Sequence, residues 1–247
     1  MLPLNDDNPT EHTPVVTITF IVACCLVFLY QSSLPPAPGE AFVYQYGAIP
    51  SVVFGHAMLP PEVAAVPAFA TMLTSMFLHG SWMHLIGNML YLWVFGNNIE
   101  DIMGHARFIL FYVVCGVLAA LSHALTDPTS TVPMVGASGA ISGVLGAYLL
   151  LFPHARVLLL APIVGTTYVP ARHRAGILVC DAAVERRREH RLAGRRGRVL
   201  CPHRRIHYRD DLDRFLQTTG GALLHAWTHQ ILALLAGCGS LQYRHRE

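Results

Sequence analysis

The chain contains no lysine, and charged residues of every kind are scarce. Of its 247 residues, 13% are charged and 53% are hydrophobic, whereas a soluble domain carries roughly 25% charged residues. All 17 basic residues are arginine, and only Arg107 and Arg156 precede residue 172. This composition argues against an ordinary soluble domain. It indicates a polytopic membrane protein up to about residue 171, followed by a segment of different character.

Metal-binding and disulfide motifs are also missing. The six cysteines show neither zinc-ligand spacing nor the spacing of a disulfide framework. Cys24, Cys25 and Cys115 lie in apolar runs, where cysteine usually serves as a small buried hydrophobe. There is no His-Glu-x-x-His sequence, so a zinc protease has little support. No basic residue precedes the first apolar run, which favours an uncleaved first span over a signal peptide.

Hydropathy predicts four membrane-spanning helices, because each apolar run approaches the ~20 residues that a bilayer requires. These runs cover residues 15–30, 83–95, 108–125 and 138–152. Residues 31–75 are rich in proline, glycine and apolar side chains. They are too apolar for a solvated loop, so we expect an interfacial, partly re-entrant segment there.

The two early arginines predict the topology. Arg107 falls between the second and third predicted spans and Arg156 follows the fourth, so both loops lie on the same side of the membrane as the N-terminus. The positive-inside rule makes that side cytoplasmic. We therefore expect a multi-pass protein of the bacterial inner membrane, with residues 1–14 as an N-terminal cytoplasmic tail. Ser138 would enter the membrane from the outer face.

Three polar side chains within these spans are the candidate functional residues. Ser138 lies among small residues at the start of the fourth span, and His84 and Asn88 are four residues apart, on one face of the second. Polar side chains in a membrane helix are expensive unless they face the bundle interior. They could join helices through hydrogen bonds, as in a small transporter. They could also stabilise an oxyanion formed when Ser138 attacks a carbonyl.

These residues belong to three motifs that follow one another in order. The motifs are Leu78-His79-Gly80-Ser81-Trp82-Met83-His84-Leu85-Ile86-Gly87-Asn88-Met89-Leu90, then Gly96 to Glu100 with Gly104 and Arg107-Phe108, then Gly136-Ala137-Ser138-Gly139. Through them, residues 71–152 resemble the core of the rhomboid intramembrane serine proteases, and the resemblance extends over roughly residues 15–170. It implies an all-α, polytopic helical bundle.

The resemblance also implies a mechanism. Ser138 would be the nucleophile, and His84 and Asn88 would form the oxyanion hole together with the Ser138 backbone N–H. The partners would be the lipid bilayer and transmembrane protein substrates, with no metal, cofactor or nucleic acid. The catalytic base would be a histidine on a sixth span, in an Ala-His-x-Gly-Gly-Phe-like context.

The fifth and sixth spans that this family needs are not evident after residue 170. Residues 172–214 hold 13 arginines and 6 acidic residues, and each charge at a helix centre costs about 2.5–3.5 kcal/mol on insertion scales. We expect a membrane domain over residues 15–170 and an aberrant, poorly folded Arg-rich tail over residues 171–247. His225 and His203 are weak candidates for the base. The chain as it stands is therefore expected to be inactive, or a relic that binds transmembrane helices without cutting them.

A shift of reading frame by one nucleotide would explain this departure. With each codon read from its second base, residues 201–206 permit Ala-His-Ile-Gly-Gly-Phe, which is the missing histidine motif. Residues 176–182 permit the apolar sequence Gly-Phe-Trp-Phe-Val-Met-Gln, and residues 215–219 permit the basic stop Phe-Phe-Lys-Arg-Arg. We therefore hypothesise a shift near residues 168–172, through mutation or sequencing error.

Overall fold

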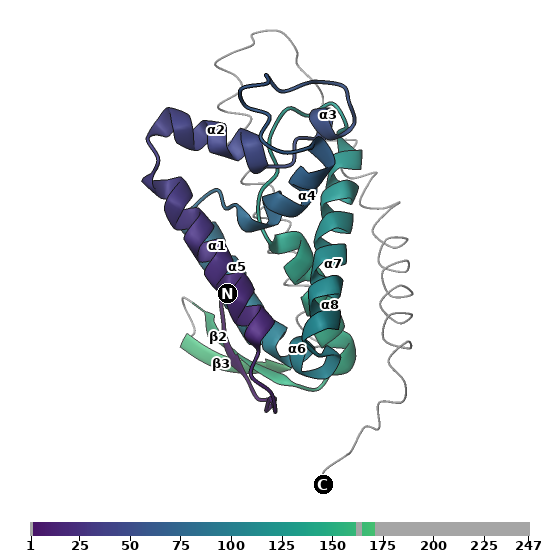
Figure 1. The fold of residues 1–247 in the computed structure, drawn as a ribbon. Helices are drawn as coiled ribbons and strands as arrows, with labels where there is room; N and C mark the ends of the chain where they lie inside the picture. Colours follow the sequence, from purple (N-terminus) through teal and green to yellow (C-terminus); the bar gives the residue numbers. More distant parts are fainter. Residues whose placement is uncertain (1, 162–164, 171–247) are drawn as a thin grey trace, which may run out of the picture. The chain divides into compact units, whose positions relative to one another are not determined.

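The computed structural model describes residues 2–161 and 165–170, which form mostly helices (Figure 1). The longer helices are α1 (Val15–Ser33), α2 (Pro36–Tyr46), α5 (Trp82–Tyr91), α6 (Asn97–Met103), α7 (His105–Thr126) and α8 (Ser138–Leu151). A π-helical stretch, η3 (Leu92–Gly96), joins α5 to α6 without a break. The segment predicted to be interfacial and re-entrant contains α2 and the short helical turns α3 (Pro50–Val53), η1 (Ala68–Ala70), α4 (Thr71–Thr74) and η2 (Ser75–Phe77).

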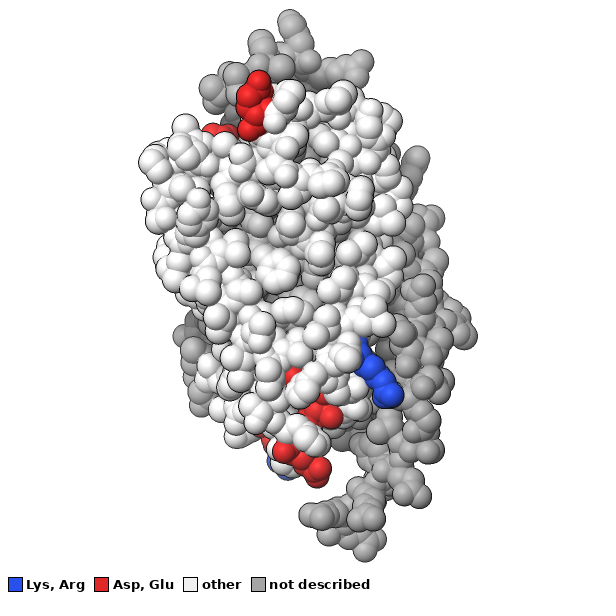
Figure 2. All heavy atoms as spheres, in the orientation of Figure 1, with Lys and Arg blue, Asp and Glu red and all other residues white. Residues whose placement is uncertain are grey.

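Two of the four predicted spans form helices that are long and apolar enough to cross a membrane. These are α1 and α7, each with a mean hydropathy of 2.2, whereas the apolar helix α8 has 14 residues. On the face drawn in Figure 2, the charged side chains of the described residues lie toward the two ends, with an uncharged band between them. The described residues thus fit a membrane-spanning helical bundle, while the number of spans remains a prediction.

Small residues allow the helices around α8 to pack closely. A Cβ on Gly139 of α8 would lie 2.6 Å from the Cβ of Ala119 on α7, and one on Gly116 of α7 would lie 3.3 Å from the Cβ of Ala140. Close backbone approach of this kind is how membrane helices gain van der Waals contact. Large side chains fill the rest of the core between α6, α7, α8 and η3. They include Phe95, Ile99, Phe108, Tyr112, Val144 and Tyr148.

The structure also contains a small sheet that the all-α expectation did not include. Its three antiparallel strands lie in the order β1 (Leu2–Asp6), β2 (Arg156–Ala161) and β3 (Gly165–Pro170). Residues 2–6, which belong to the expected N-terminal tail, pair with β2 with Leu2 opposite Leu160 and Asp6 opposite Val157. The start of the chain is therefore built into the same end of the bundle as β2. The expected tail over residues 171–247, with His203 and His225, lies outside the described residues.

Candidate active site

Ser138 is the first residue of α8, and the loop before it is held on two sides. Met134 and Ala48 exchange backbone hydrogen bonds, with N···O distances of 3.1 and 2.8 Å. The Gly136 N–H donates to the Ser75 carbonyl at 2.8 Å. The first intrahelical bond runs from the Ile141 N–H to the Ala137 carbonyl, so the amides of the first turn, including that of Ser138, have no partner within the helix.

The helix α5 presents His84 and Asn88 one turn apart, as the sequence predicts. It begins after Ser81, whose extended backbone and side chain form an N-cap: Ser81 Oγ accepts a hydrogen bond from the His84 N–H at 3.2 Å. His84 is half-buried, and Asn88 is buried with 9% of its surface exposed. The Asn88 Nδ2 donor has no hydrogen-bond partner among the described residues. A buried donor in that state favours a further acceptor.

Both side chains point to Gly136, two residues before Ser138. A Cβ on Gly136 would lie 2.7 Å from Cε1 and 2.8 Å from Nε2 of His84, and 3.6 Å from Nδ2 of Asn88. Gly136 also has a φ of +119°, a backbone conformation that side-chain-bearing residues rarely adopt. Only glycine therefore suits this position. The structure brings the polar pair of α5 against the loop that leads into Ser138.

His79 is a neighbour of this group that the sequence analysis names only as part of the first motif. Its side chain is fully buried, and its ring meets the ring of His84 edge-on, with centroids 5.2 Å apart. The ring also faces Phe28 of α1, and the His79 carbonyl accepts a hydrogen bond from Gln31 Nε2 at 3.0 Å. His79 thus packs behind His84. The signal that could have found it is its spacing of five residues before His84, at the point where the chain enters α5.

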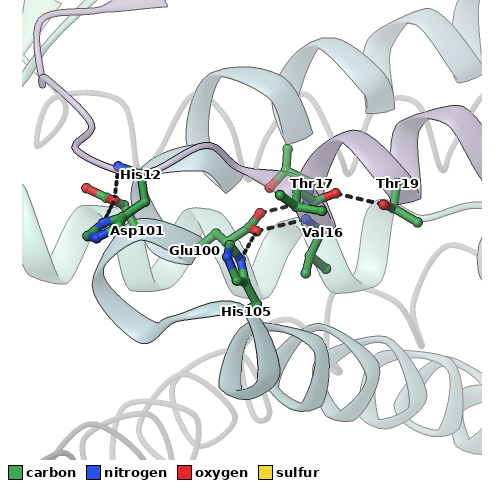
Figure 3. Close-up of polar contacts among 8 residues, drawn as sticks. His12, Val16, Thr17, Thr19, Glu100, Asp101 and His105 are labelled. Carbon is green, nitrogen blue, oxygen red and sulfur yellow. Dashed lines mark hydrogen bonds and ion pairs between the residues drawn. The ribbon is translucent and has the colours of Figure 1, made fainter.

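A second polar cluster lies on α6, at the far end of the continuous run α5–η3–α6. In Figure 3 the Glu100 carboxylate of α6 faces the start of α1, where it accepts hydrogen bonds from the N–H groups of Val16 (2.8 Å) and Thr17 (2.7 Å). His105 Nδ1 lies 2.6 Å from the same carboxylate. Burial alone would raise the pKa of Glu100, but these hydrogen bonds outweigh it and lower the pKa below its ordinary value. Glu100 therefore anchors the first turn of α1.

The neighbouring carboxylate, Asp101, holds the segment that precedes α1. It accepts hydrogen bonds from the N–H groups of Glu11 (3.0 Å) and His12 (2.8 Å), and His12 Nδ1 lies 2.7 Å away. Burial works to raise the pKa of Asp101, but these contacts lower it overall. An open hollow of about 230 Å³ is lined here by His12, Thr13, Pro14, Glu100, Asp101, Gly104 and His105. No group of three or more His, Cys, Asp or Glu in the described part of the chain is arranged to hold a metal ion.

The residues of the candidate site lie in a region that matches a known protein family. The sequence model of the rhomboid domain matches residues 67–180. Rhomboid protein 1, mitochondrial, of Saccharomyces cerevisiae is 39% identical over 100 residues, which are 38% of this chain and 29% of that protein. RHOMBOID-like protein 5 of Arabidopsis thaliana is 38% identical over 78 residues, or 32% of this chain and 25% of the relative.

A bacterial relative gives the same result. Rhomboid protease GluP of Bacillus subtilis is 40% identical over 78 residues, or 32% of this chain and 15% of that protein. The chain thus spans less than a third of the length of these three relatives. The family match includes all three motifs, with His84, Asn88 and Ser138, and leaves out residues 181–247. Residues 67–180 therefore match the rhomboid domain.

Proposed function

We propose that this chain descends from an intramembrane serine endopeptidase that cleaves transmembrane segments of other membrane proteins. In this proposal Ser138 Oγ attacks the carbonyl carbon of the scissile peptide bond, and the π electrons of the carbonyl move onto its oxygen. The Ser138 N–H, His84 and Asn88 donate hydrogen bonds to that oxygen. Preorganised donors of this kind are worth about 10²–10³ in kcat each.

The observation that carries the proposal is the convergence of His84 and Asn88 on Gly136. The two side chains lie against the loop that leads into Ser138, and Asn88 Nδ2 is a buried donor without a partner among the described residues. A merely structural role, in which the pair joins two helices, would be expected to satisfy that donor. The unpartnered amide beside the loop that leads into Ser138 favours an oxygen-binding role.

The proton of Ser138 needs an acceptor, because serine is a weak nucleophile without a base. We propose that the base was a histidine of a sixth span and that its motif is encoded in the other reading frame over residues 201–206. Nucleophile and base act as a unit, so the chain as it stands should lose most of its activity.

Labelling with a fluorophosphonate probe tests this proposal. The chain carrying the alternative-frame residues from about residue 170 should label at Ser138, and its Ser138→Ala variant should not. The chain as printed should label weakly or not at all. Labelling elsewhere than Ser138, or its persistence in Ser138→Ala, would overturn the assignment of the nucleophile.

A second candidate is a relic that binds transmembrane helices without cleaving them, favoured by the Arg-rich residues 172–214. The two candidates predict different behaviour of the alternative-frame chain. A protease would label and cleave, whereas a relic would bind a transmembrane peptide in detergent without cutting it, in either frame.

Location and topology are part of the proposal. Asp7 pairs with Arg156, and Asp101 holds His12, so the N-terminal segment, the end of α6 and β2 lie at one end of the bundle. We assign this end to the cytoplasmic side and the Ser138 end to the outer side, in a bacterial inner membrane. Relatives named mitochondrial and chloroplastic make other membranes the alternative.

A further inference from the structure

The carboxylate of Asp6 links two helices that do not follow each other in the sequence. Its Oδ2 atom accepts hydrogen bonds from Tyr148 Oη of α8 at 2.7 Å and from Asn98 Nδ2 of α6 at 2.9 Å. Asn8 Nδ2 donates to the same oxygen at 3.3 Å and to Tyr148 Oη at 2.9 Å. Tyr148 is fully buried and Asn98 is 2% exposed. We call Asp6, Asn8, Asn98 and Tyr148 the polar clamp.

The polar clamp lies at the opposite ends of the two helices that carry the proposed catalytic residues. Asn98 follows His84 by 14 residues along the unbroken run α5–η3–α6, a rise of about 21 Å at 1.5 Å per residue. Tyr148 follows Ser138 by 10 residues in α8, about 15 Å further along that helix. Phe95 of η3 and Tyr148 of α8 also meet edge-on next to the clamp, with ring centroids 4.8 Å apart. The polar clamp and the candidate site are therefore carried by the same two elements, the run α5–η3–α6 and the helix α8.

The buried donors of α6 and α8 at the clamp take their shared acceptor from outside these two helices. The Tyr148 hydroxyl and the Asn98 amide both donate toward the same position, and both are buried. A buried donor that loses its acceptor is costly. The Asn98 amide also donates to the Val94 carbonyl at 3.2 Å and to Asn97 Oδ1 at 2.8 Å, so the Tyr148 hydroxyl is the donor that would lose its acceptor without the carboxylate. We therefore expect the end of α8 to shift until this hydroxyl finds another partner. Asp6 supplies the acceptor from β1.

We propose that Asp6 is a positioning residue that fixes the spacing of α6 and α8, and through it the alignment of His84 and Asn88 with Ser138. The consequence for catalysis rests on the proposed function, whereas the alignment itself does not. Asp6 and Asn8 are then part of the active-site scaffold, although they lie at the other end of the bundle.

A thiol at position 138 can report this alignment without any need for proteolysis. In Ser138→Cys, the thiol would lie at the N-terminus of α8, two residues after Gly136, which adjoins His84. A helix N-terminus and a neighbouring imidazolium both lower thiol pKa values and speed alkylation. The experiment measures the alkylation rate of this introduced thiol against pH with iodoacetamide, by peptide mass spectrometry. Peptide mass spectrometry distinguishes alkylation at position 138 from alkylation of the native cysteines.

The variants are made in this Ser138→Cys background. Asp6→Ala should slow alkylation at neutral pH by up to about 10²-fold, the loss that a misplacement of about 1 Å can cause at a reacting group. Tyr148→Phe removes one clamp hydroxyl, keeps the ring against Phe95 and should slow it in the same direction. Asp6→Asn keeps a carbonyl acceptor and should restore most of the rate.

The matched control is Asp7→Ala, on the next residue along the chain. Asp7 accepts from the Arg156 N–H at 2.8 Å and pairs with its side chain at 3.4 Å, and both side chains have exposed surface. It is not among the partners of Asn98 or Tyr148 in the clamp, so the introduced thiol should react at the parent rate.

Amide hydrogen exchange of the last turn of α8 shows whether the clamp itself has opened. Faster exchange there in Asp6→Ala and Tyr148→Phe, with an unchanged alkylation rate of the introduced thiol in both, would overturn the positioning role. Equal effects of Asp6→Ala and Asp7→Ala would also overturn it. A failure of fluorophosphonate labelling in the alternative-frame chain would count against the proposed protease and would leave the clamp result unaffected.

Discussion

Replacing Gly136 with alanine is a strong test of the proposed site, because the new methyl group would enter the space that His84 occupies. Two costs arise. The φ of +119° is unfavourable for any residue with a Cβ, which costs about 1–3 kcal/mol. The Cβ would also lie 2.7–2.8 Å from the His84 ring, and overpacking of this kind costs about 1–3 kcal/mol.

A matched control separates the two costs. Gly55 also has a positive φ, +74°, but a Cβ there would meet nothing within 4 Å. Gly55→Ala should therefore cost only backbone strain, about 1–2 kcal/mol. We expect Gly136→Ala to reduce the free energy of unfolding by about 2–6 kcal/mol, as the sum of strain and overpacking.

The assay is reversible unfolding of the detergent-solubilised chain, repeated in a His84→Ala background. Removing the imidazole should relieve the overpacking, so that Gly136→Ala then costs only backbone strain, about 1–3 kcal/mol. A Gly136→Ala cost equal to that of Gly55→Ala in the parent chain would refute the reasoning. So would a cost that His84→Ala leaves unchanged.

Three further predictions concern the scaffold and the gene. Glu100→Gln should destabilise the fold by about 2–3 kcal/mol, through loss of charge-assisted hydrogen bonds. Because folding lowers the pKa of Glu100 from its ordinary 4.5, its stabilisation is present above that pH and lost as the pH falls through the folded value. Denaturant melts against pH should therefore show a weaker acid-side loss in Glu100→Gln. Gly139→Ala should cost about 1–3 kcal/mol, and Ala119→Gly should rescue it in the same melts, whereas additive losses would contradict the close α7–α8 contact. Sequencing of the gene around codon 170 should find codons that permit the alternative-frame residues, and codons that forbid them would end that hypothesis.

The sequence predicts the long apolar helices and the helical face that bears His84 and Asn88. Hydropathy is enough for α1 and α7, because length and composition are local properties. The spacing of His84 and Asn88 is likewise local. The approach of these two side chains to Gly136 is not a local property, because it depends on the contacts that place α8 beside α5. Within the sequence analysis, only the family resemblance indicated that His84 and Asn88 lie near Ser138.

Other features arise from long-range contacts that periodicity does not encode. Residues 2–6 contain a proline, an asparagine and an aspartate, which are rare in strands. They become β1 because β2 offers a pairing edge about 150 residues away. The π-helical stretch η3 changes the helical phase between Asn88 and Asn98. The deep burial of His79 against His84 also depends on Phe28 of α1. In each case tertiary contacts override the local pattern.

The central claim is that His84 and Asn88 donate to one oxygen bound at Ser138. The most direct measurement is the rate of cleavage of a transmembrane peptide by the alternative-frame chain, with Asn88→Ala, His84→Ala and the double variant. The account predicts that each single change lowers kcat by about 10²–10³ with little effect on KM, and that the double variant loses less than the product. Unchanged kcat with raised KM in both single variants would contradict it.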